Sequence, residues 1–115
     1  SKILVLGLSY KKDVDDTRES PALVIIEMLK AKGCQVDYHD PFVIRIGRTR
    51  EHLSLMGMES VSLTPTTLAA CDAVLIITDH TEVDYGMVVA HASLVVDTRN
   101  ATRGIPDQDG KVVKA

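Results

Sequence analysis

The chain of 115 residues lacks the features that mark several specialised classes of protein. Its two cysteines, Cys34 and Cys71, form neither a disulfide framework nor a Cys-x-x-Cys pair, so we expect a reducing, cytoplasmic environment. No apolar run approaches the ~20 residues needed to span a membrane, and the sequence enters an apolar segment at once, so we expect no signal peptide. The net charge of −3, without a Lys/Arg cluster, argues against nucleic-acid binding.

Aromatic residues are also scarce, at 3%, although hydrophobic residues make up 45% of the chain. The core must therefore be aliphatic, which suits buried parallel strands because these read as nearly continuous aliphatic runs. At this length we expect a single domain over residues 1–115.

Apolar runs alternate with helical patterns along the sequence. Helices are expected from Pro21, after the N-cap residue Ser20, to Gly33, and then over 48–56, 64–71 and 82–92. Strands are expected over 2–6, 34–38, 61–63, 72–78 and 94–97, with a possible edge strand at 112–113. This alternation predicts a three-layer, Rossmann-like α/β domain with a mostly parallel sheet of five or six strands and helices on both faces.

The segment 7–20, between the first strand and the first helix, is far longer and more polar than an ordinary βα connection. Long loops at the carboxyl edge of a parallel sheet are where such folds bind ligands. Lys11 and Arg18 are suited to a phosphate, and Asp15 and Asp16 are placed to orient them. The alternative is a solvated loop whose Asp–Arg pairs only maintain its shape.

The same loop lacks the usual nucleotide fingerprints. A dinucleotide-binding loop reads G-x-G-x-x-G, but here Gly7 is followed by Leu8 and Ser9, and no Walker A motif occurs. A bound nucleotide must therefore be held by side chains. A second candidate is Arg99, in the Asp-Thr-Arg-Asn segment that follows the strand ending at Asp97. Its alternative roles are to cap a helix or to pair with Asp97. None of the four histidines has metal-ligand spacing, so no metal site is predicted.

Two motifs, Gly-Leu-Ser-Tyr-Lys at 7–11 and Asp-Asp-Thr-Arg-Glu-Ser-Pro at 15–21, resemble the start of the C-terminal UDP-sugar-binding domain of the UDP-glucose/GDP-mannose dehydrogenase family. The resemblance continues through residues 38–41, 73–78 and 96–100, and so covers nearly the whole chain. The form of the first loop is most similar to the branch that acts on UDP-N-acetylhexosamines.

The resemblance implies a place in an enzyme that oxidises the C6 alcohol of a UDP-sugar to a carboxylate with NAD. It implies that Tyr10, Lys11 and Arg99 contact the UDP-sugar and that Arg18 reaches the NAD cofactor. The family's NAD-binding N-terminal domain, its central dimerisation segment and its catalytic cysteine have no counterpart in residues 1–115. We therefore expect no catalytic residue here, inactivity of the chain alone, its own N-terminal domain as a partner and a homo-oligomeric full-length enzyme.

Two other functions fit the same size and pattern. A receiver-type signalling module needs an acidic pair at the end of its first strand, an acceptor aspartate after the third strand and a lysine after the fifth. Here the acidic pair is displaced to Asp15 and Asp16, and the fifth strand leads to Arg99. An interaction domain that has lost ligand binding is the third possibility.

Overall fold

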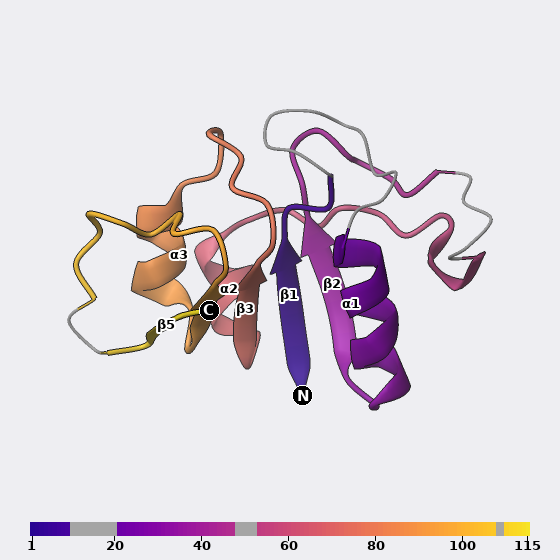
Figure 1. The fold of residues 1–115 in the computed structure, drawn as a ribbon, viewed down its shortest axis with the longest axis horizontal. Helices are drawn as coiled ribbons and strands as arrows, with labels where there is room; N and C mark the ends of the chain where they lie inside the picture. Colours follow the sequence, from indigo (N-terminus) through magenta and orange to yellow (C-terminus); the bar gives the residue numbers. More distant parts are fainter. Residues whose placement is uncertain (10–20, 48–52, 108–109) are drawn as a thin grey trace.

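The computed structural model describes residues 1–9, 21–47, 53–107 and 110–115. In these residues a single sheet contains β1 (Lys2–Leu6), β2 (Gln35–His39), β3 (Ala73–Ile76), β4 (Val95–Asp97) and β5 (Val112–Lys114). The spatial order is β2-β1-β3-β4-β5, and each neighbouring pair is parallel (Figure 1). All the strands therefore present their carboxyl ends at one edge of the sheet.

Helices cover both faces of the sheet, as predicted. On one face, α1 (Pro21–Ala31) packs through Ile26 on Val5 and Tyr38. On the other face, α2 (Pro65–Ala69) and α3 (Tyr85–His91) enclose a second cluster that includes Leu4 and Leu6 (Figure 1). Successive residues of β1 thus enter opposite clusters, as the period of two in a strand requires. The buried residues are mainly aliphatic, as the composition indicated.

Several predicted boundaries are wrong. Residues 61–63 do not form a strand, although Val61 donates a hydrogen bond from its backbone nitrogen to Tyr38 at 2.8 Å beside β2. The capping box at Thr64 starts α2 directly after residue 63, so the segment is too short to form the hydrogen bonds of a β-ladder. The third helix begins at Tyr85 rather than 82, because Asp84 caps it by accepting a hydrogen bond from the backbone of Met87.

The expected helix over 48–56 is described only in its last part. There, η1 (Leu53–Leu55) is a single 3-10 turn, and Gly57 follows it with a φ of +85°. The start of this element lies outside the described residues. The second strand begins at Gln35, one residue later than expected, and Cys34 is half-buried rather than fully enclosed.

Gly7 brings β1 and the segment after β3 unusually close together. Its φ is +86°, and an added Cβ would lie 2.3 Å from the backbone oxygen of Thr78. Thr78 in turn donates its side-chain hydroxyl to the backbone oxygen of Ser9 at 2.8 Å. Only glycine satisfies both the backbone angle and the contact at this position.

Asp97 shapes the turn that follows β4. Its side chain is fully buried, and its two oxygens accept hydrogen bonds from four groups of the turn and from Lys114, namely the backbone nitrogens of Arg99, Ala101 and Thr102, the Thr102 hydroxyl and the Lys114 ammonium. Burial would raise the pKa of this carboxyl, but the hydrogen bonds from Thr102, Ala101 and Arg99 outweigh it and hold the pKa well below its ordinary value.

We expect Gly7→Ala to destabilise the fold by about 3 kcal/mol, since left-handed strain and overpacking against the Thr78 backbone add together. The matched control is Gly33→Ala, at a similar φ of +88° but with nothing within 4 Å of the added Cβ, which should cost about 1 kcal/mol. Urea denaturation followed by circular dichroism measures both. Equal losses in the two variants would show that the contact with Thr78 is not the constraint.

We expect Asp97→Asn to destabilise the fold by about 2–4 kcal/mol at pH 7, because an amide NH₂ at either oxygen position would face backbone N–H groups that can only donate. Because the folded-state pKa is lowered, the stabilisation by Asp97 is present above the unfolded-state pKa and is lost as pH falls below about 4. The variant should therefore lose less stability than the wild type between pH 7 and pH 3. Asp72→Asn, at an exposed carboxylate that accepts one hydrogen bond from Lys2, is the control.

Candidate functional site

The candidate site lies where the chain changes direction across the sheet. From β1 the chain moves outward to β2, and from β2 it crosses to the opposite side of β1 to form β3. In open parallel sheets of this order, ligands bind outside the carboxyl ends of the two strands at such a switch point. Here those ends are followed by residues 7–9 and 77–80 (Figure 1).

A buried carboxylate occupies the base of this region. Asp40, which follows β2 and is fully buried, accepts hydrogen bonds on Oδ2 from the backbone nitrogens of Leu8 at 2.7 Å and Ser9 at 3.0 Å. Its Oδ1 accepts from the backbone nitrogens of Phe42 at 2.8 Å and Val43 at 3.1 Å. In a glycine-rich nucleotide loop the backbone amides after the first strand face a phosphate. Here an internal carboxylate takes that place.

His80 completes the arrangement around Asp40. Its Nε2 lies 2.8 Å from Asp40 Oδ2 and 3.0 Å from Ser9 Oγ, and all three residues are fully buried. Burial would raise the pKa of Asp40, but the hydrogen bonds from His80 and from the backbone of Leu8, Phe42 and Ser9 lower it below its ordinary value. Asp40 is therefore ionised and can only accept, so His80 Nε2 carries the proton between them.

The Ser9, His80 and Asp40 side chains do not form a nucleophilic triad. In a triad, one imidazole nitrogen faces the hydroxyl and the other faces the carboxylate. Here a single nitrogen contacts both, and the hydroxyl is inaccessible to a substrate. His80 thus joins its own segment to residues that lie 40 and 71 positions earlier in the sequence.

Arg99 lies at the same edge of the sheet. Its backbone nitrogen donates to Asp97 Oδ1 at 3.0 Å, and its side-chain Nε donates to the backbone oxygen of Ile77, just after β3, at 2.8 Å. The proposed alternative of an Arg99–Asp97 ion pair is wrong, because the cation that pairs with Asp97 is Lys114, at 3.2 Å. The Nε bond places the side chain of Arg99, an exposed residue, against the segment that follows β3.

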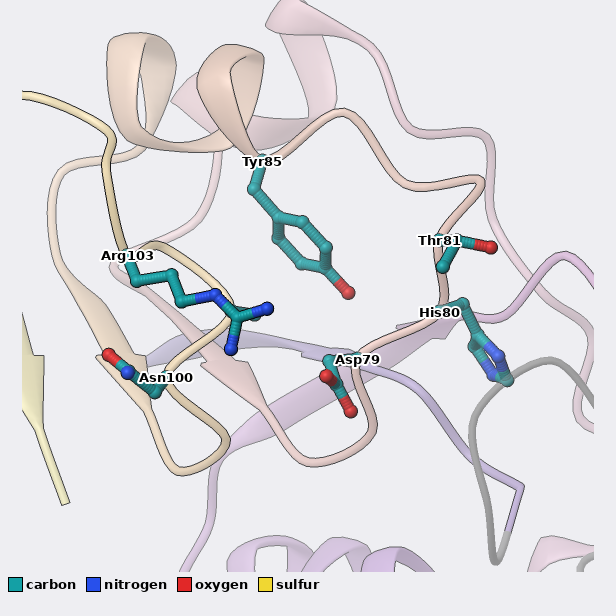
Figure 2. A pocket seen from close by; sticks show the side chains of 7 residues that line it. Asp79, His80, Thr81, Tyr85, Asn100 and Arg103 are labelled. Atoms are coloured by element: carbon teal, nitrogen blue, oxygen red, sulfur yellow. The ribbon is translucent and has the colours of Figure 1, made fainter.

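A pocket of about 190 Å³ opens between the loop after β3 and the loop after β4. Figure 2 shows the side chains of Tyr85 and Arg103 extending into it from α3 and from the second loop. Asp79, His80, Thr81, Asn100 and Ala101 complete the lining. Sequence reasoning missed Tyr85, Asp79 and Arg103 because the two loops meet only in the folded chain.

Three of the predicted site residues, Tyr10, Lys11 and Arg18, lie outside the described residues. Both cysteines are free, and burial raises the pKa of the Cys71 thiol, which makes Cys71 a poor nucleophile. In the described part of the chain, no group of His, Cys, Asp and Glu side chains could hold a metal ion. Nor is any described helix long and apolar enough to cross a membrane.

Comparisons with known proteins identify the family. Residues 4–104 match the model of the UDP-glucose/GDP-mannose dehydrogenase family, UDP binding domain. The chain is 34% identical over 110 residues to UDP-N-acetyl-D-mannosamine dehydrogenase of Pyrococcus horikoshii, covering 90% of the chain and 23% of that protein. It is 32% identical over 108 residues to UDP-glucose 6-dehydrogenase of Rhizobium meliloti, covering 90% of the chain and 24% of that protein.

The structure agrees with this assignment. It superposes on the solved UDP-D-ManNAc dehydrogenase from Pyrococcus horikoshii with a TM-score of 0.72 and 27% sequence identity, over 99% of this chain and 25% of that chain. This chain therefore spans only a part of the length of the relatives it matches. The family match over residues 4–104 and the similarity to these relatives show that the chain belongs to the UDP-glucose/GDP-mannose dehydrogenase family and corresponds to the UDP-binding domain of that family.

Proposed function

We propose that this chain binds the diphosphate of a UDP-sugar at the β1–β3 switch point and serves as the substrate-binding domain of an NAD-dependent nucleotide-sugar 6-dehydrogenase. The observation that carries the proposal is the anchoring of Arg99. Because Nε is bound to the Ile77 oxygen at 2.8 Å, the fork of the guanidinium is fixed in direction before any ligand arrives. A planar, pre-oriented guanidinium is suited to two phosphate oxygens at once.

The occupied amides of Leu8 and Ser9 support the same reading. Since Asp40 already accepts from both, this backbone cannot also bind a phosphate, and a diphosphate here needs cationic side chains. Arg99 supplies one such side chain from the β4 turn. We propose that Tyr10 and Lys11, which directly follow Ser9 in the sequence, supply further contacts to the UDP-sugar.

The oxidation itself requires groups that this chain does not supply. We propose that NAD and the catalytic cysteine belong to other parts of the full-length protein, that Arg18 contacts NAD, and that the N-terminal domain is the partner that closes the site. A homo-oligomeric, cytoplasmic enzyme is part of the same proposal. The relatives include dehydrogenases of UDP-glucose and of UDP-N-acetyl-D-mannosamine, and we favour a UDP-N-acetylhexosamine as substrate because of the first-loop motif.

We expect Arg99→Gln to weaken UDP binding about 10- to 100-fold, as loss of a charge-assisted, bidentate contact predicts. Isothermal titration calorimetry of the full-length protein with UDP measures this change. Lys32→Gln, which removes one positive charge just beyond α1 near the opposite edge of the sheet, is the matched control and should leave the affinity unchanged. An Arg99→Gln protein with wild-type affinity for UDP would refute the proposed site.

We also expect the isolated chain to distinguish UDP from NAD. In an amide NMR titration, UDP should shift the signals of Arg99, Ile77 and their neighbours, whereas NAD should leave these signals in place, because the family's NAD fingerprint is absent from residues 1–115. Shifts of the same residues by NAD instead of UDP would assign this edge of the sheet to the cofactor.

A further inference from the structure

We propose that His80 is a positioning residue of the UDP-sugar site: through Asp40 and Ser9 it fixes where the chain leaves β1 relative to Arg99. This inference rests on the proposed function. It assigns a role to a residue that no sequence motif of the site includes. The residues immediately after Ser9 are Tyr10 and Lys11, so the position of Ser9 sets the point from which those side chains start.

The contacts of His80 connect the two sides of the switch point. On one side, Nε2 donates to Asp40 Oδ2 at 2.8 Å, the same oxygen that accepts from the backbone nitrogens of Leu8 and Ser9. On the other side, His80 belongs to the segment after β3, where Ile77 anchors the Arg99 guanidinium. The His80 ring therefore links the β1 exit to the segment on which Arg99 is anchored.

The surroundings of the ring hold it in one orientation. Phe42 packs against it with the ring centroids 5.0 Å apart, and the imidazole is fully buried. Figure 2 shows the ring turned away from Tyr85 and Arg103, although the residue lies in the wall of the pocket. His80 is thus placed to act on a ligand only through its neighbours, which is why we describe it as positioning and not catalytic.

The geometry also specifies which atom matters. Because ionised Asp40 can only accept, the contact with Asp40 needs a hydrogen-bond donor at the place of Nε2. The amide nitrogen of glutamine reaches a similar distance from the backbone and carries such a donor, whereas leucine fills comparable space without one. His80→Gln and His80→Leu therefore form a matched pair that differs in the donor.

The test is the affinity for UDP, measured by calorimetry in the full-length protein. We expect His80→Leu to weaken binding about tenfold, as loss of a hydrogen bond to a charged group predicts, and His80→Gln to stay within about threefold of the wild type. Ser9→Ala, which keeps the backbone bonds to Asp40 and removes only the hydroxyl, should weaken binding by a smaller factor in the same direction. It also provides the readout if His80→Leu does not fold.

A variant that only loses stability is the control that separates an effect of His80 on the geometry of the site from an effect on folding. Leu68→Ala removes a fully buried side chain from the cluster under α2 and α3, on the face of the sheet away from Asp40 and Ser9, and should lower thermal stability without changing the affinity for UDP. Rescue by glutamine, together with wild-type affinity in Leu68→Ala, supports positioning. Equal loss of affinity in His80→Gln and His80→Leu, or in Leu68→Ala, overturns it.

The same experiment distinguishes the two proposals. If the wild-type protein does not bind UDP, the proposed function fails and this inference fails with it. If the wild type binds UDP and loses affinity in Arg99→Gln but not in His80→Leu or Ser9→Ala, the function stands and the role of His80 is refuted. A long-range ¹H–¹⁵N spectrum of the histidines gives an independent check, because a ring of His80 without a proton on Nε2 would also overturn the assignment.

Discussion

The carboxylate of Asp40 is the interaction on which the ligand-binding edge of this domain depends. It accepts five hydrogen bonds, from the backbone of Leu8 and Ser9 after β1, from Phe42 and Val43 in its own turn, and from His80 after β3. A buried charge is tolerated only when its lone pairs are satisfied in this way. This one carboxylate therefore links the segments that follow β1, β2 and β3.

This arrangement explains how the proposed UDP site can exist without a glycine-rich loop. In a dinucleotide-binding fold, glycines let the pyrophosphate approach the backbone amides after the first strand. Here Gly7 is used for close packing against Thr78, and the amides of Leu8 and Ser9 are taken by Asp40. In the proposed function, the diphosphate is therefore bound by side chains at the edge of the sheet, such as Arg99.

The general fold was predictable because its signals are local. Aliphatic runs with few aromatics indicated a buried parallel sheet. The alternation of these runs with helical patterns indicated that helices cover both faces of that sheet. The expected strand at 61–63 was wrong because the Thr64 capping box ends that segment, which makes only isolated contacts beside β2. The spatial order of the strands does not exclude a receiver module, because receiver modules have the same strand order. The match of residues 4–104 to the dehydrogenase family distinguishes this chain from a receiver.

The site was predictable only in part, for a related reason. The position of Arg99 followed from the rule that ligands meet the carboxyl ends of parallel strands, whereas its anchor on Ile77 depends on a contact between different strands. The bonds of His80 to Asp40 and Ser9 join residues distant in sequence, and no local pattern encodes them. Tyr10, Lys11 and Arg18 remain predictions from motif resemblance.

If Arg99 binds the diphosphate, as proposed, its anchoring has a consequence for selectivity between sugars. Ile77 accepts the Nε hydrogen bond from Arg99 and donates its own backbone nitrogen to Leu6 of β1 at 2.9 Å. The Arg99 side chain is therefore tied, through Ile77, to the end of β1. A diphosphate held at a fixed point leaves discrimination between hexoses to groups that project beyond the sheet. In this chain, the long segment 7–20 is the region with the length and polarity for that role.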